Sequence, residues 1–224
     1  MSRSVGLGIA ATLVLVGLAF FWGVVLLAAA VNPGYSHGRD YISTLAAHGA
    51  AHGWLGVLAI VAASGAMLAA AVLVRPLSRL AGISIALAGV GFIVVAFSRL
   101  DCPSGAAGCG LGGRFAISGA TEVTHWTATT VSTVLLIAGI AFTGLALVRH
   151  GRTLAGVASW AAAAGTTAAF LAMGGRSPGD VQRLGVLLAT GWLAVVAIAT
   201  LAHQARVGSP TRARTPSGER PESP

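Results

Sequence analysis

The chain has 224 residues, of which 55% are hydrophobic and only 9% are charged, and its formal net charge is +8. A soluble domain usually carries about 25% charged residues, so this little charge cannot cover a water-facing surface. Most of the surface is therefore expected to face lipid. The 14 basic residues are all arginines, spread over loop ends and a tail. This dispersion argues against nucleic-acid binding, for which basic residues gather on one face.

Six apolar runs follow one another along the chain, and each is close to the length of about 20 residues that crosses a bilayer. The first run, 5–31, is preceded by Arg3 and contains three alanines at 28–30, as a signal peptide would. It is longer than the apolar part of a signal peptide, so we expect an uncleaved helix. The other helices are expected at 54–74, 80–98, 126–148, 154–173 and 184–203.

The fold class predicted from these runs is all-α, a polytopic transmembrane bundle of six helices over residues 1–203. Residues 204–224 are rich in Pro, Ser, Thr and Arg, a composition too polar to bury a core. They are expected to form a disordered, basic cytoplasmic tail. The bundle is expected to lie in the cell (inner or plasma) membrane as a multi-pass protein.

The arginines also predict the orientation of the bundle. With the N-terminus inside, the cytoplasmic arginines are Arg3, Arg75, Arg79, Arg149, Arg152, Arg206, Arg212, Arg214 and Arg220. The outer ones are Arg39, Arg99, Arg114, Arg176 and Arg183. Because arginine is in excess on the cytoplasmic side of membrane proteins, we predict that both termini are cytoplasmic.

The first outer loop contains two features with competing interpretations. Asp40 precedes a short stretch from Tyr41 and is expected to cap a helix there by accepting backbone N–H bonds. The alternative is that Arg39 and Asp40 recognise a charged headgroup. His48 and His52 have the spacing of paired zinc ligands. Glycines interrupt this stretch and the acid of an H-E-x-x-H motif is absent, so we expect no metal and no other cofactor.

The second outer loop contains the only two cysteines, Cys102 and Cys109. Both lie on the predicted oxidising side of the membrane, which favours a disulfide between them. The alternatives are that they stay reduced, or that they bind a metal together with a histidine.

Candidate acid–base residues flank this loop. Asp101 follows the third run, and Glu122 and His125 lie one turn apart at the start of the fourth. If these three converge, they could transfer protons. The alternative is a polar belt in which Asp101 pairs with Arg99 or Arg183. Arg183 could also hold Glu122 or clamp a lipid phosphate, for which its planar fork is suited.

Short motifs around these runs follow a recognisable order. They are Pro33-Gly34-Tyr35, Asp40-Tyr41-Ile42-Ser43-Thr44-Leu45, Asp101-Cys102-Pro103, His125, Gln182-Arg183-Leu184 and Trp192. In these motifs, over roughly residues 5–203, the chain resembles the DUF998 family of six-pass bacterial and archaeal membrane proteins of unknown function. The resemblance implies a six-helix bundle with a polar outer cluster. It supplies no activity and no catalytic residue, and the histidines at 37, 48 and 52 are outside its pattern.

Three functions follow from these observations. The first is a non-catalytic membrane protein that binds lipid or a membrane partner through the outer polar cluster. The second is a membrane-embedded enzyme that acts on an outer-leaflet lipid through Asp101 and His125. The third is a small transporter, which is disfavoured because no run has an ionisable residue in its middle. We expect membrane lipids as partners, and the residues leave homo-oligomerisation open.

Overall fold

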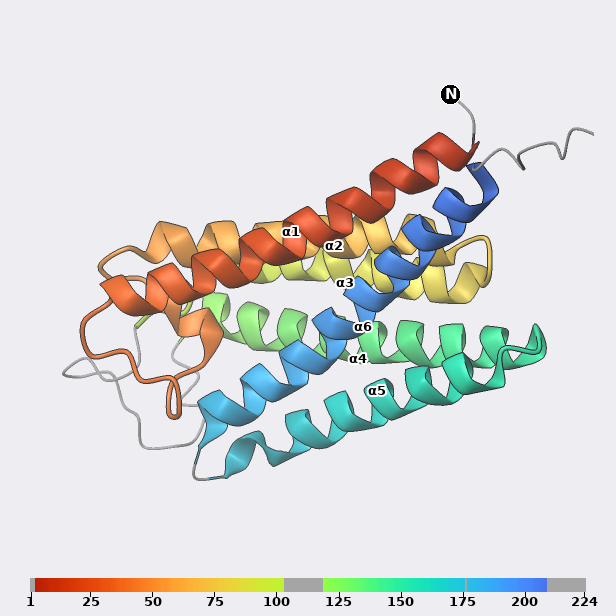
Figure 1. Cartoon of the computed structure of the whole chain (residues 1–224). Coiled ribbons are helices and arrows are strands. Elements are labelled where there is room, and N and C mark those ends of the chain that lie inside the picture. Colours follow the sequence, from red (N-terminus) through yellow and green to blue (C-terminus); the bar gives the residue numbers. More distant parts are fainter. Residues whose placement is uncertain (1–2, 103–118, 176, 209–224) are drawn as a thin grey trace, which may run out of the picture.

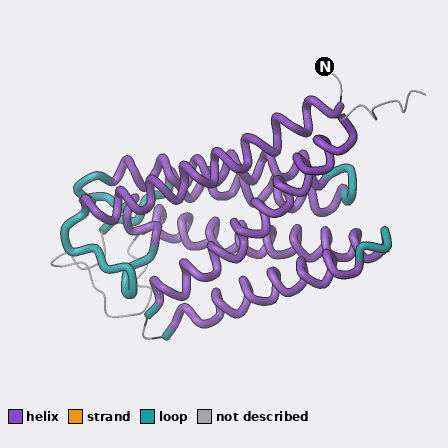
Figure 2. The backbone as a smooth tube through the Cα atoms, in the orientation of Figure 1, coloured by secondary structure: helices purple, strands orange, loops and turns teal. Residues whose placement is uncertain are grey.

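The computed structural model describes residues 3–102, 119–175 and 177–208, and this part of the chain consists of helices and loops (Figures 1 and 2). The long helices are α1 (Arg3–Val31), α2 (Gly53–Val74), α3 (Arg79–Phe97), α4 (Ala120–Arg149), α5 (Thr153–Leu171) and α6 (Pro178–Gly208). Two 3₁₀ helices, η1 (Ile42–Ala46) and η2 (Ala172–Gly174), lie in loops. All six long helices have the length and hydropathy to cross a membrane. The prediction of an all-α protein with six long apolar helices is confirmed.

Two helices begin earlier than their apolar runs. Helix α4 begins at Ala120 rather than at 126, and α6 begins at Pro178 rather than at 184. The apolar run marks the part of a helix that fits hydrocarbon, whereas the backbone hydrogen bonds continue into polar residues. Proline is suited to the first position of α6 because it has no N–H to satisfy there. As a result, Glu122 and Arg183 lie on helices and not in loops.

The helices form a closed ring. Each helix contacts the next along the chain, and α6 contacts α1 in turn. Both described ends of the chain lie at one end of the bundle, together with the α2–α3 and α4–α5 turns, which we call the termini end (Figure 1). The opposite end contains η1 and the ends of α1, α3 and α5, and we call it the η1 end (Figure 1). Residues 204–208 extend α6. The rest of the expected tail lies outside the described residues.

The bundle is apolar on both its inner and outer surfaces. The core contains many small residues, such as Ala11, Ala70 and Ala81, which are fully buried. Large side chains such as Leu26 and Val195 are exposed on the outside. Small residues allow helices to approach closely where no hydrophobic effect drives them together. This distribution is the one expected of a protein surrounded by lipid.

At the η1 end, η1 packs directly on helix α2. The contact occurs at Gly56, where an added Cβ would lie only 2.6 Å from the carbonyl oxygen of Leu45 and would also overlap the backbone of Ala46. A glycine is therefore required for this close approach of two backbones. Gly65, on the same helix, is exposed, and a Cβ added there would meet no atom within 4 Å.

We predict that Gly56→Ala and Gly65→Ala have opposite effects on stability. Gly56→Ala forces η1 away from α2 and should lower the free energy of unfolding by roughly 1–3 kcal/mol, as overpacking does. Gly65→Ala should be neutral or stabilising by up to about 1 kcal/mol, because alanine favours a helix. Denaturant unfolding in a mild detergent measures both. Equal effects of the two substitutions would show that η1 is not seated on α2.

Candidate functional site

The connection between α1 and α2, residues 32–52, is called the first loop. Asp40 is fully buried in it at the η1 end, and its carboxylate closes a turn of this loop. The carboxylate accepts hydrogen bonds from the backbone N–H of Ser36 at 2.8 Å and from Nε of Arg39 at 3.1 Å. The backbone N–H of Asp40 in turn donates to the Ser36 carbonyl at 2.8 Å. The expected helix cap is not formed, because the carboxylate is turned back into this turn. Tyr41 precedes η1 instead, without a side-chain cap.

Arg183, from the start of α6, fastens this turn to the bundle. Its Nη1 donates to the backbone carbonyls of His37 and, at 3.2 Å, of Asp40, and its Nη2 donates to the Tyr35 hydroxyl. The guanidinium also lies over the Tyr35 ring, 5.4 Å from the ring centre. Burial raises the pKa of Tyr35 to about 12, although the nearby positive charge of Arg183 opposes this change. Tyr35 therefore stays protonated and accepts from the guanidinium as a neutral hydroxyl.

A second arginine holds the far end of the same loop. Arg99, just after α3, donates from Nε to the carbonyl of Ala46 at 2.5 Å and from Nη2 to that of Ala47 at 2.9 Å. The backbone N–H of His48 donates to the Leu100 carbonyl at 2.8 Å. The first loop is thus tied to the end of α3 and to the start of α6 by arginine donors that meet its backbone carbonyls and by its own His48 N–H.

The predicted headgroup residues are brought together, but they differ in how exposed their side chains are. Asp40 and Arg183 hold the loop, whereas the side chain of Arg39 is 51% exposed and pairs with Asp40. The hydrogen bond that Arg39 donates to the Asp40 carboxylate raises the pKa of Arg39. Arg39 is therefore the member of the set that can reach a headgroup.

The predicted acid–base residues lie where α3 ends and α4 begins. Asp101 is exposed, with its carboxylate 3.6 Å from where a Cβ on Gly119 would lie. Glu122 is in the first turn of α4, where a negative charge favours the helix. His125 is 1% exposed, and its Nδ1 lies 2.6 Å from the Ser98 carbonyl. A carbonyl only accepts, so Nδ1 carries the proton, and His125 links α4 to the end of α3.

An aromatic pair joins the two groups of predicted site residues. The Trp126 ring packs edge-on against His125, with ring centres 5.7 Å apart, and edge-on against Tyr41 at 5.8 Å. Tyr41 follows the Asp40 turn in the chain. The two groups are therefore neighbours at the η1 end.

The remaining sequence predictions at this end concern metal and disulfide. His48 and His52 are both exposed and precede α2, and Gly49 between them has a φ of +81° that interrupts any helix. In the described part of the chain, no three His, Cys, Asp or Glu residues lie close enough to hold a metal ion. Cys109 lies outside the described residues, so its disulfide with Cys102 stays a prediction.

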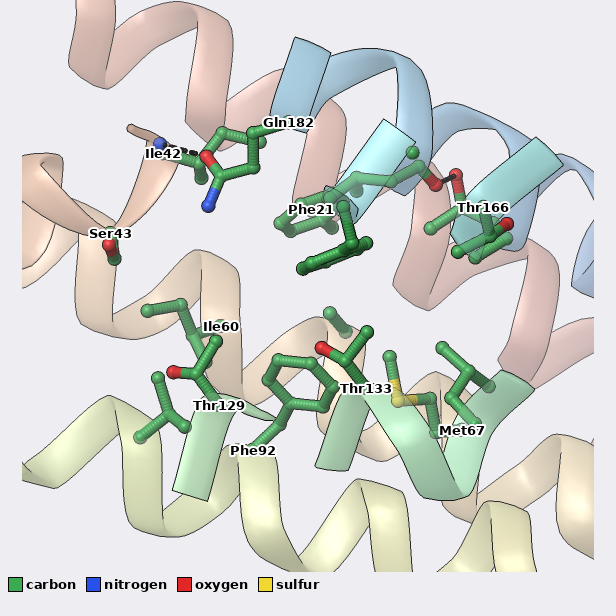
Figure 3. A pocket seen from close by; sticks show the side chains of 18 of the residues that line it. Phe21, Ile42, Ser43, Ile60, Met67, Phe92, Thr129, Thr133, Thr166 and Gln182 are labelled. Atoms are coloured by element: carbon green, nitrogen blue, oxygen red, sulfur yellow. Dashed lines mark hydrogen bonds between the residues drawn. The ribbon is translucent and has the colours of Figure 1, made fainter. Parts of the chain in front are cut away.

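Beneath the first loop lies a cavity of about 90 Å³ (Figure 3). Every long helix and η1 contribute to its wall, which is mainly apolar. The polar side chains that line it are Ser43, Thr129, Thr133, Thr166, Gln182 and Thr190. Three of the hydroxyls, those of Thr129, Thr133 and Thr166, are buried and have no hydrogen-bond partner among the described residues.

Sequence reasoning missed this cavity because it looked for ionisable residues. The available signal was the polar spacing of Thr129 and Thr133, which lie four apart and so share a face of α4. Gln182 was visible only as part of a loop motif. The structure places it on α6, where its Oε1 accepts from the backbone N–H of Ile42 at 2.7 Å. It therefore belongs both to the loop attachment and to the cavity wall.

We predict that Arg183→Lys loosens the first loop, whereas Arg39→Lys does not. Lysine cannot reproduce a planar fork that meets three acceptors, and hydrogen bonds of charged groups contribute about 1.5–3 kcal/mol each. Backbone hydrogen exchange in residues 36–47 should therefore become roughly tenfold faster or more in Arg183→Lys. Hydrogen–deuterium exchange with mass spectrometry measures this. Similar exchange in both variants would contradict the role assigned to Arg183.

Comparison with known proteins places this architecture in a family. Residues 15–199 match the family described as Protein of unknown function (DUF998). No curated protein and no solved structure shows significant similarity to the chain. The match covers all six long helices in whole or in part and all of the residues that hold the first loop. The chain belongs to the DUF998 family of proteins of unknown function.

Proposed function

We propose that this protein binds one amphipathic, lipid-like molecule, whose apolar part enters the cavity beneath the first loop. The cavity is the observation that carries the proposal. Its wall is mainly apolar and comes from all six long helices, so it is a feature of the whole bundle. Sites for small molecules are typically apolar hollows with a few polar groups. An apolar cavity of about 150 Å³ holds benzene, so one of about 90 Å³ suits part of a larger molecule.

We further propose that both termini are cytoplasmic, which puts the cavity at the outer side of a plasma or inner membrane. The support is the excess of arginines at the termini end, where Arg75, Arg79, Arg149, Arg152 and Arg206 belong to the described residues. Arginine on the cytoplasmic side follows the usual charge rule for membrane proteins. In this orientation the exposed Arg39 lies at the level of outer-leaflet headgroups.

The geometry favours binding over catalysis by the Asp101 and His125 pair. A general acid or base must reach the proton that it transfers. His125 is buried, is engaged with the Ser98 carbonyl, and is not among the residues that line the cavity. This arrangement explains His125 as a link between two helices.

The packing of the bundle also gives a transporter little support. Met67, Leu136 and Ala189 line the cavity and also belong to the buried apolar cluster that fills the bundle toward the termini end. The cavity is therefore backed by packed side chains in the described part of the chain. A binding site open on one side fits this arrangement.

We expect native mass spectrometry of the detergent-purified protein to find one retained apolar molecule per chain. Ala63→Phe places a ring in the cavity, because Ala63 is buried in its wall, and should abolish this retention. Ala164→Phe, at an exposed position on α5, is the matched control and should retain the molecule. Size-exclusion chromatography and helical circular dichroism check that each variant is folded. The proposal fails if folded Ala63→Phe carries the same lipid as the wild type.

A further inference from the structure

The amide of Gln182 has a fixed orientation at the roof of the cavity. A backbone N–H is a donor, so the Gln182 atom that meets Ile42 N at 2.7 Å must be the acceptor Oε1. The amide nitrogen then points the other way, and Figure 3 shows it directed into the open space below. The attachment of the first loop thus presents a hydrogen-bond donor to whatever occupies the cavity.

The unpartnered hydroxyls are unusual for this bundle. Thr143 and Thr167 donate to carbonyls of their own helices at 2.8 and 2.9 Å, as hydroxyls in membrane helices commonly do. Thr133 and Thr166 are 5% and 1% exposed, line the cavity and have no such partner in the described residues. The surrounding hydrocarbon has no group that can satisfy them. Their hydroxyls are therefore available to a ligand.

The cavity contains no charge to balance an anionic or cationic ligand. Among the described residues that line it, none is Asp, Glu, His, Lys or Arg. Burying an unpaired charge is far more costly than burying a neutral polar group with a hydrogen bond. Arg39 and Arg183 lie outside the lining. The occupant of the cavity is therefore electrically neutral in the part that enters.

We propose that the cavity binds the carbonyl-bearing part of a neutral lipid, with the carbonyl oxygen accepting from the Gln182 amide and from the Thr133 or Thr166 hydroxyl. This inference rests on the proposed function and names the chemical class of its ligand. The ester carbonyl of a neutral glyceride and the ring carbonyl of a prenyl quinone share this chemistry. Because the cavity is only partly enclosed and holds about 90 Å³, the remaining apolar chain stays outside it.

The test is a native mass spectrometry titration of the full-length protein in detergent with four probes. Dioctanoylglycerol and an n-decyl benzoquinone carry the carbonyl, n-hexadecane lacks it, and dioctanoyl phosphatidic acid adds a charge. Thr133→Val and Thr166→Val each remove one unpartnered hydroxyl. Thr143→Val and Thr167→Val are their matched controls on the same two helices, because each removes a hydroxyl that already has a partner.

We expect at least one carbonyl probe to bind one-to-one and more tightly than n-hexadecane. Loss of one hydrogen bond should lower the affinity for that probe by about fivefold in Thr133→Val or Thr166→Val. The affinity should be unchanged in both controls. Binding of n-hexadecane should be the same in all variants. The carbonyl probe that binds more tightly distinguishes a glyceride from a quinone.

The outcomes that overturn the two proposals differ. If no probe binds to the wild type, both the proposed function and the inference about the ligand class are wrong. If n-hexadecane binds as tightly as the carbonyl probes, and the valine substitutions have no effect, the cavity binds apolar chains and only the carbonyl inference fails. Tighter binding of phosphatidic acid than of dioctanoylglycerol would overturn the requirement for a neutral ligand if it persists in Arg39→Gln, which removes the exposed charge outside the cavity.

Discussion

The structure depends on how the backbone of the first loop is satisfied at the edge of a membrane. Buried carbonyl groups require donors, and hydrocarbon supplies none. Arg99 and Arg183 supply them from the end of α3 and the start of α6, and each guanidinium meets more than one carbonyl. The planar fork of arginine suits this task better than the single ammonium group of lysine. The loop becomes a roof over the bundle because of these two side chains.

The same attachment shapes the interior beneath the roof. Gln182 accepts from Ile42 with its oxygen, and its nitrogen faces the cavity (Figure 3). In the proposed function, docking of the loop and recognition of a ligand share one amide group. A molecule that engages the Gln182 nitrogen also stabilises the loop above it, and an opened loop removes the donor from the cavity. We therefore propose that binding at this site and order in the first loop are coupled.

The sequence was sufficient to predict the six long helices, because the length of a membrane-spanning helix follows from the thickness of the bilayer. It was less informative at helix ends, since α4 and α6 continue through polar residues such as Glu122 and Arg183. The hydrogen-bond partners of Arg183 could not be predicted from the sequence either. Sequence reasoning offered it carboxylates or a phosphate, whereas it binds backbone carbonyls, which every residue has. The cavity exists because the side chains of all six helices leave one space unfilled. The spacing of Thr129 and Thr133 alone does not predict such a space.

The most direct measurement is a density map of the protein in lipid nanodiscs that resolves side chains at the η1 end. We expect the first loop to be seated on α6, with Arg183 against the Asp40 turn and the Gln182 amide against Ile42. We also expect elongated density in the cavity, within hydrogen-bonding reach of Thr133 or Thr166. A loop lifted away from α6, or lining side chains closed on one another with no density between them, would contradict both the attachment of the loop and the proposed binding.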